Sequence, residues 1–193
     1  MFYFFGKSLS TAFFVFIFRI EVSGSENIPS RGGFILASNH VSFLDPVALG
    51  VASPRRLSFM AQHDLFFNPL FSWLISNLGA FAVRRDAPGL AAFKEAIRRI
   101  NQGAALVIFP EGRRVPKGET AKPEAGVGFL AQKLNVPVIP AFIKGTEVAL
   151  PKGARFIRPT EVTVHFGKQI LVERRAPYED IAEQIMQEIR RLS

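Results

Sequence analysis

A histidine and an aspartate lie five residues apart in a short polar segment that directly follows an apolar run. The segment reads Ser-Asn-His-Val-Ser-Phe-Leu-Asp-Pro over residues 38–46 and contains His40 and Asp45. If a strand ends before this segment and a helix begins within it, the carboxylate can fold back to the imidazole, fix its tautomer and stabilise the imidazolium. The pair is therefore a candidate catalytic dyad with His40 as general base. The alternative is that Asp45 only caps the helix and His40 is an ordinary turn residue.

Two further polar turns follow apolar runs. Residues 109–114 read Phe-Pro-Glu-Gly-Arg-Arg, where Glu111 can bond turn amides or a substrate hydroxyl and Arg114 can hold a phosphate through its planar guanidinium. Residues 79–86 place Arg84 and Arg85 at the end of another apolar run, where either can bind phosphate. For both turns, the alternative is surface charge without a ligand.

The elements that must position these turns alternate between strands and helices. Apolar or alternating runs predict strands at 19–24, 34–37, 57–60, 80–83, 105–109, 136–143 and 161–166. Apolar periodicity predicts helices at 64–78, between Pro88 and Gly103, and at 124–134 and 178–192. A further helix is expected to open at Ser42, with Asp45 at capping-box spacing. Pro137 and Pro140 place the 136–143 strand near a sheet edge, and residues 144–160 are expected to form a loop.

This alternation predicts an α/β fold: a single layered domain with a central, mostly parallel or mixed sheet flanked by helices. In such sheets, functional residues gather at the carboxyl ends of strands, where the three polar turns are expected to lie.

Residues 2–18 are almost wholly apolar and predict a membrane-associating helix over residues 1–20, preceding a domain over residues 21–193. As a helix, the apolar stretch 2–18 extends about 25 Å, against roughly 30 Å of bilayer hydrocarbon, which favours a helix lying in the interface. A single membrane span, a buried core helix and a cleaved signal peptide are the alternatives. The last has no basic amino-terminal region and no cleavage site in its favour.

Composition narrows the function classes. The chain of 193 residues has a formal net charge of +8 and 20 Phe, which favours anionic or lipid partners. Its lack of Cys excludes disulfides, thiolate catalysis and Cys-based zinc sites. The three His residues lack metal-ligand spacing, so no metal is predicted. Nucleic acid is not expected as a partner, because no recognition motif accompanies the charge.

Together and in this order, these segments resemble the glycerophospholipid acyltransferase family, which includes 1-acylglycerol-3-phosphate acyltransferases. His40 to Asp45 resembles the family's H-x4-D block, and residues 79–84 resemble a second block ending in Arg84. Residues 109–114 resemble the F-P-E-G-T-R block, and residues 136–140 resemble the apolar fourth block. The similarity covers about residues 22–170.

The resemblance implies a role for each matching residue. His40 would deprotonate an acceptor hydroxyl, Asp45 would orient His40, and Arg84 and Arg114 would hold the acceptor's phosphate. Glu111 and Gly112 would shape the acceptor site. The implied partners are an acyl-CoA or acyl carrier protein donor, a lysophospholipid acceptor and the cytoplasmic face of the cell membrane. No cofactor and no metal are implied.

The sequence departs from the family pattern at the acceptor side. Arg113 and Val115 stand where the family has Thr and Ser, and Gln62 stands where relatives carry a Lys. We therefore expect acylation of 1-acylglycerol-3-phosphate to phosphatidic acid, with another lysophospholipid or lipid hydroxyl as the alternative acceptor. A lipid-binding protein without catalysis is the alternative from another functional class.

Overall fold

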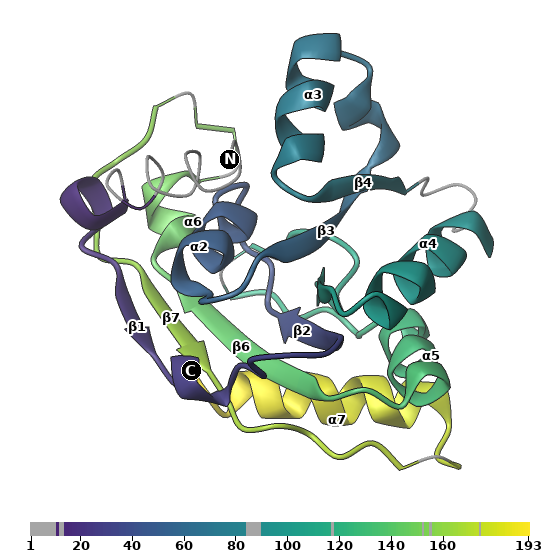
Figure 1. Ribbon diagram of the computed structural model, residues 1–193. Coiled ribbons are helices and arrows are strands. Elements are labelled where there is room, and N and C mark those ends of the chain that lie inside the picture. Colours follow the sequence, from purple (N-terminus) through teal and green to yellow (C-terminus); the bar gives the residue numbers. More distant parts are fainter. Residues whose placement is uncertain are drawn as a thin grey trace.

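A mixed sheet forms the centre of the molecule. The computed structural model of the chain describes residues 11, 14–83, 90–116, 118–151, 153–154, 156–173 and 175–193 (Figure 1). The strands in these residues are β1 (Glu21–Ser23), β2 (Phe34–Ser38), β3 (Leu57–Gln62), β4 (Ala80–Val83), β5 (Ala105–Ile108), β6 (Val138–Lys144) and β7 (Thr163–Phe166). They form one sheet in the order β1-β7-β6-β2-β5-β3-β4.

The strand directions place one set of loops at a common edge. Strand β2 pairs in parallel with both β5 and β6, and β3 pairs in parallel with β5 and β4. Strand β7 runs antiparallel to β6, and β1 runs parallel to β7. The carboxyl ends of β2 to β6 and the amino ends of β1 and β7 therefore meet at one edge, which we call the carboxyl edge.

Helices cover both faces of the sheet, as Figure 1 shows. The helices in the described residues are η1 (Ser25–Asn27), α2 (Asp45–Ala52), η2 (His63–Phe66), α3 (Pro69–Asn77), α4 (Leu90–Asn101), α5 (Ala125–Leu134), α6 (Thr146–Ala149) and α7 (Tyr178–Arg190). One buried cluster joins α2 and α6 to one face, and a second joins α4, α5 and α7 to the other. The predicted α/β architecture with a flanked, mixed sheet is confirmed.

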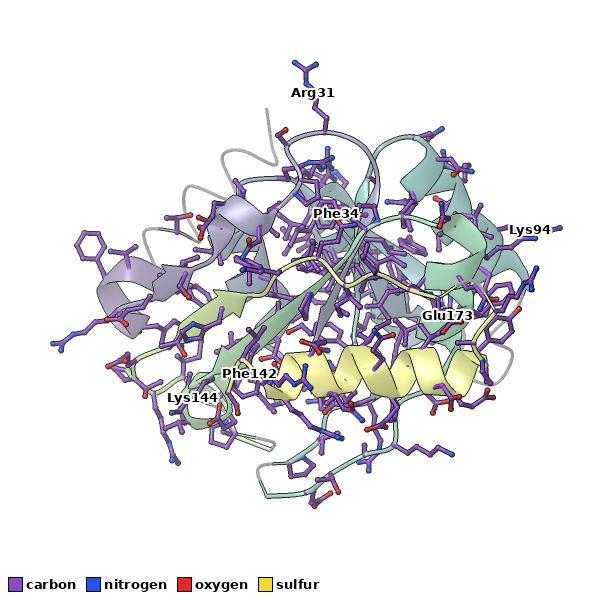
Figure 2. The ribbon with its side chains drawn as sticks, turned by 90° about the horizontal axis from the view of Figure 1, so that it is seen from below. Arg31, Phe34, Lys94, Phe142, Lys144 and Glu173 are labelled. Carbon is purple, nitrogen blue, oxygen red and sulfur yellow. The ribbon has the colours of Figure 1, made fainter. Side chains whose placement is uncertain are left out.

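Strand β2 contributes side chains to the buried clusters on both faces of the sheet. Phe34 and Leu36 belong to one buried cluster, whereas Ile35 and Ala37 belong to the other. Successive side chains of a strand point to opposite faces, so a continuous apolar run is required in a strand covered on both sides. In Figure 2, Phe34 lies among the densely packed interior side chains, whereas Arg31 and Lys94 project away from the molecule.

The expected position of β6 near a sheet edge is wrong, because β6 lies inside the sheet, with β7 and β1 on one side and β2, β5, β3 and β4 on the other. Its proline fits there because the pairing with β7 is interrupted. The antiparallel ladder ends at Ala141, and an isolated bridge continues at Val138. Pro140 lies in this interruption, where its carbonyl accepts a bond from the Gly167 amide at 2.8 Å and its missing N–H is not needed.

Two helix predictions also need correction. Helix α2 begins at Asp45 rather than Ser42, and the Ser42 hydroxyl donates to the carbonyl of Leu150 at 3.1 Å instead of capping the helix. The expected loop at 144–160 contains the short helix α6. Four helical residues are too few to produce a recognisable apolar period.

The amino-terminal prediction falls largely outside the described residues. Residues 14–18 are helical, with Phe14 and Phe18 buried in the cluster beneath α2, while Phe16 is 83% exposed. Of the helices that the structure describes, none is both long and apolar enough to cross a bilayer. The membrane-associating helix and the division at residue 20 stay predictions.

Candidate active site

The candidate residues that the structure describes converge at the carboxyl edge. His40 follows the end of β2, and the turns after β5 and β6 are its neighbours because these strands flank β2. The carboxyl ends of parallel strands are the usual location of functional sites in such sheets. The structure thus brings the segment with His40 and Asp45 next to the Glu111 turn, at the edge of the sheet where the sequence predicts them.

The imidazole of His40 is bonded to a fully buried carboxylate. Its Nδ1 lies 2.7 Å from Oδ2 of Asp45, and the same oxygen accepts the backbone N–H groups of Val41 at 2.7 Å and Ser42 at 2.8 Å. An ionised carboxylate only accepts, so Nδ1 is assigned the proton and donates. This tautomer leaves the lone pair on Nε2, which bonds to none of the described residues.

The second oxygen of Asp45 has a partner that the sequence did not reveal. The hydroxyl of Thr146, at the start of α6, donates to Oδ1 at 2.5 Å and is itself fully buried. Thr146 comes directly after β6 at the carboxyl edge, and Gly145 before it has a φ of +94°. A polar residue after a predicted apolar strand was the available signal.

The loop after β5 holds His40 from several sides. The Phe109 ring stacks on the imidazole with centroids 4.0 Å apart and planes 17° from parallel. The His40 amide donates to Oε2 of Glu111 at 2.7 Å, and its carbonyl accepts from the Val115 amide at 2.7 Å. Both the backbone and the ring of His40 are therefore fixed, while its side chain keeps 18% of its surface exposed.

Glu111 is a buried acid with a perturbed proton affinity. Burial raises its pKa from 4.5 to about 7, the bond from the His40 amide opposes this rise, and the negative charge of Asp45 adds to it. An oxygen of either the neutral or the ionised carboxyl can accept the His40 N–H. Near neutral pH, Glu111 is thus divided between both forms while it anchors the histidine backbone.

The remaining predicted residues differ in what surrounds them. The Arg114 guanidinium carbon lies 3.4 Å from the centre of the Phe43 ring, which places this cation beside the dyad turn. Gly112 has a φ of +63°, and a Cβ there would lie 3.1 Å from Cγ of Glu124. Arg84 lies outside the described residues, so its place relative to the site stays a prediction.

Asn39 is a further residue that sequence reasoning missed. Its amide group donates to the Ile143 carbonyl at 2.9 Å and accepts from the Ile143 amide at 2.8 Å. The buried side chain thereby joins the end of β2 to β6 and fixes the backbone position of the next residue, His40. Its direct adjacency to His40 was the only signal in the sequence.

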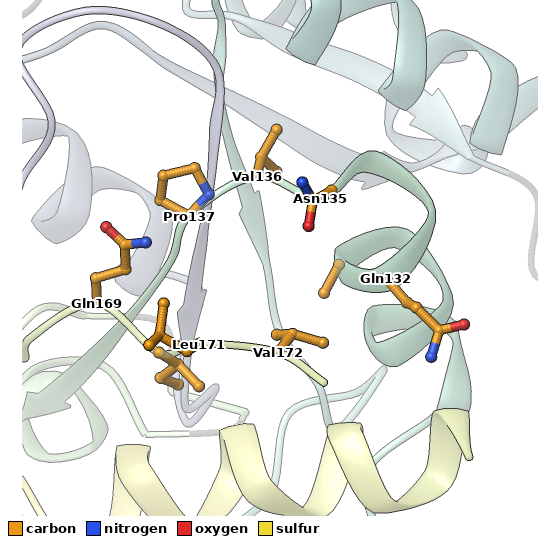
Figure 3. A pocket seen from close by; sticks show the side chains of 9 residues that line it. Gln132, Asn135, Val136, Pro137, Gln169, Leu171 and Val172 are labelled. Atoms are coloured by element: carbon orange, nitrogen blue, oxygen red, sulfur yellow. The ribbon is translucent and has the colours of Figure 1, made fainter. Parts of the chain in front are cut away.

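A cavity of about 260 Å³ lies away from this site. Figure 3 shows it between the end of α5, the residues before β6 and the segment 169–172. Pro137 and Val136 in its wall precede the amino end of β6, whereas His40 follows the carboxyl end of the parallel β2. The cavity is therefore at the opposite edge of the sheet and is not the dyad's substrate site.

Known proteins share both the sequence pattern and this fold. The chain is similar to the 1-acyl-sn-glycerol-3-phosphate acyltransferase of Bacillus subtilis, with 32% identity over 127 residues, covering 65% of this chain and 63% of that protein. It is similar to the enzyme of the same name from Pseudomonas aeruginosa, with 34% identity over 125 residues, covering 63% of this chain and 48% of that protein. The chain thus spans less than two thirds of both relatives.

A solved structure is similar over nearly the whole chain. The 1-acyl-sn-glycerophosphate acyltransferase PlsC from Thermotoga maritima superposes with a TM-score of 0.84 and 26% identity, covering 96% of this chain and 76% of that one. The Acyltransferase family model matches residues 19–144, a stretch that contains the dyad, the Glu111 turn and β6. This match covers well over half of the sequence, and the chain therefore belongs to the acyltransferase family.

Proposed function

We propose that this chain transfers a fatty acyl group from a thioester donor, acyl-CoA or acyl carrier protein, to the free hydroxyl of 1-acylglycerol-3-phosphate. The observation that carries the proposal is the 2.7 Å contact between His40 Nδ1 and buried Asp45, which directs the basic Nε2 away from the carboxylate. Family membership and the names of the relatives support the choice of reaction.

In this reaction, Nε2 of His40 takes the proton of the acceptor hydroxyl as its oxygen attacks the thioester carbonyl carbon. Asp45 stabilises the imidazolium that forms. Collapse of the tetrahedral intermediate breaks the carbon–sulfur bond, and the imidazolium returns its proton to the leaving thiolate. The products are the ester and the free thiol, and no covalent acyl-enzyme and no metal take part.

A cation beside the dyad turn suits a phosphorylated acceptor. Arg114 lies over Phe43 beside the dyad turn, where its planar guanidinium can pair with a phosphate in a fork geometry. We assign Arg84 the same role from its place in the family pattern. Glu111 and Gly112 shape the acceptor site, with Glu111 acting through its bond to the His40 backbone.

Gln62 favours another lysophospholipid as the alternative acceptor. Strand β3 ends at Gln62, in the position where the family pattern has a Lys, and β3 ends at the same edge as β2. A neutral amide contributes no charge to phosphate binding, which favours a lysophospholipid with a different headgroup.

We also propose that the reaction takes place at the cytoplasmic face of the cell membrane, where such acceptors reside. The net charge of +8 and the exposed apolar residues Val15, Phe16 and Ile17 support this location.

Thiol release measures the reaction directly. The protein would be incubated in detergent micelles with a long-chain acyl-CoA and each of several lysophospholipids, and free CoA would be followed with a thiol reagent. The chain contains no Cys and so adds no background of its own. We expect release that depends on 1-acylglycerol-3-phosphate. Greater release with another lysophospholipid would favour the second acceptor, and release independent of any acceptor would contradict acyl transfer.

A further inference from the structure

The segment η2–α3 exposes an unusual amount of apolar surface. Phe67, Leu70 and Trp73 are 71%, 76% and 54% exposed, and α3 contains no buried residue. Helix α3 packs mainly against η2 and β4, and in Figure 1 it stands clear of the layers that cover the sheet. Contiguous exposed apolar surface on a folded protein marks a place where another molecule binds.

The charge pattern of this segment points to lipid. Asp64 in η2 is its one acidic residue, and residues 65–83 after it contain no Asp, Glu, Lys or Arg, although charged residues make up 21% of the whole chain. Surfaces that bind another protein usually carry a polar and partly charged rim. An uncharged apolar helix with a Trp is suited to the interface between headgroups and hydrocarbon, where indole rings are enriched.

The same edge of the sheet carries both this segment and the dyad. Segment η2–α3 follows the carboxyl end of β3, just as His40 follows the carboxyl end of the parallel β2. Other exposed aromatic residues lie at this edge: Phe43 within the dyad turn, Phe16 before β1 and Phe156 before β7. Since β1 and β7 run opposite to β2, the residues before them also meet the carboxyl edge.

We propose that η2–α3 docks onto a lipid bilayer and sets the carboxyl edge of the sheet, with His40, against the membrane surface. The benefit of this orientation for catalysis rests on the proposed function, because a lipid acceptor then reaches Nε2 without leaving the bilayer. A second copy of the chain is the other possible occupant of this surface. A formal charge of +8 on each copy opposes that pairing and favours an anionic leaflet.

Tryptophan fluorescence reports directly on α3, because Trp73 in this helix is the only tryptophan of the chain. Full-length protein would be mixed with vesicles of phosphatidylglycerol and phosphatidylcholine, with and without brominated acyl chains. We expect a blue shift of the Trp emission on vesicle binding and quenching by the brominated lipids. Vesicle binding with unchanged emission would show that another element docks, and an absence of vesicle binding would equally overturn the proposal.

Two exposed leucines make a matched pair of variants. Leu70→Ser removes an apolar side chain from α3, and we expect roughly tenfold weaker vesicle binding, the equivalent of burying one large aliphatic side chain. Leu171 is 80% exposed but follows Ile170, which pairs with the amino end of β6 at the opposite edge. Leu171→Ser should leave vesicle binding unchanged. Equal losses in both variants would contradict docking through α3.

Two further outcomes distinguish lipid docking from self-association and from the proposed function. A blue shift that grows with protein concentration in the absence of vesicles would assign the surface to a second copy and overturn lipid docking. Vesicle binding is measured without acyl donor or acceptor, so its failure is independent of turnover. A protein that docks through α3 but releases no thiol with any acceptor would contradict the proposed function alone.

Discussion

Both carboxylate oxygens of Asp45 are occupied by donors. Oδ2 lies within 2.8 Å of His40 Nδ1 and the amides of Val41 and Ser42, and Oδ1 accepts the Thr146 hydroxyl. A fully buried carboxylate is costly unless its hydrogen-bonding capacity is satisfied. These four donors offset that cost and hold Asp45 in one orientation, so that the imidazole is held with it.

The first prediction separates the charge of Asp45 from its anchoring. Asp45→Asn should lower turnover by about 100-fold or more, because the amide cannot stabilise the imidazolium. Thr146→Val removes one hydrogen bond to this carboxylate but leaves its charge, and should cost about 1.5–3 kcal/mol of unfolding free energy with a much smaller loss of turnover. Turnover and thermal melts of both variants check this. An equal loss of turnover in the two would contradict the assigned role of the charge.

The second prediction concerns Glu111 and pH. Its pKa is raised in the folded state to about 7, so the stability linked to its proton is fully present below pH 4.5 and is lost as pH rises through 7. This difference between the folded and unfolded pKa of Glu111 corresponds to roughly 3 kcal/mol of unfolding free energy at most. Glu111→Gln keeps an acceptor for the His40 amide but does not titrate. We expect the wild type to lose stability relative to this variant between about pH 5 and pH 8 in urea titrations. If the stability of the wild type and of Glu111→Gln changed in parallel with pH, the raised pKa of Glu111 would be contradicted.

At the scale of residues, sequence spacing predicted only contacts between residues that are close along the chain. His40 and Asp45 are five residues apart, and their contact followed from a strand-to-helix turn. Thr146 is 101 residues from Asp45, and Asn39 bonds Ile143 across 104 residues. Such contacts depend on which strands are neighbours, and residue spacing along the chain does not specify that order.

Elements meet through close backbone contacts, and α5 shows this with two glycines. A Cβ on Gly128 would lie 2.1 Å from the backbone oxygen of Tyr178 in α7, whereas a Cβ on Gly126 would meet the end of the Phe93 ring at 3.4 Å. The first is a clash with backbone, and the second is ordinary contact. Gly128 thus permits α5 and α7 to pack together on the sheet.

The third prediction follows from this pair. Gly128→Ala should destabilise the protein by about 1–3 kcal/mol, since a rigid backbone must shift. Gly126→Ala should be neutral or stabilising by up to about 1 kcal/mol through helix propensity. Denaturant titrations of both variants measure the difference. Similar losses in both would mean that α5 and α7 do not approach closely at Gly128.

At the scale of elements, periodicity predicted most strands and helices close to their observed bounds. Pro137 and Pro140 predict a strand near an edge because proline cannot donate to a ladder, but an interrupted ladder with β7 accommodates Pro140 inside the sheet. Helix α6 was missed because its four residues are held by tertiary contacts such as the bond from Thr146 to Asp45.

The whole molecule combines a strongly basic chain with an apolar carboxyl edge. We expect vesicle binding to respond to both properties. Raising NaCl from about 0.05 M to about 0.5 M should weaken binding to anionic vesicles several-fold, since salt screens the attraction, while the apolar contribution persists. Co-sedimentation at several salt concentrations measures this, with neutral vesicles as the control. Binding to anionic vesicles that is unaffected by salt would contradict a role for the net charge.

The most direct measurement of the central claim is thiol release by His40→Ala. His40 is partly exposed, and Asp45 keeps its two amide donors and Thr146 in the variant, so the fold should be retained and a thermal melt checks it. With His40 as general base, turnover should fall by about 10²- to 10⁴-fold. A folded His40→Ala protein that turns over within about tenfold of the wild type would contradict the assignment, because that loss falls below the general-base range.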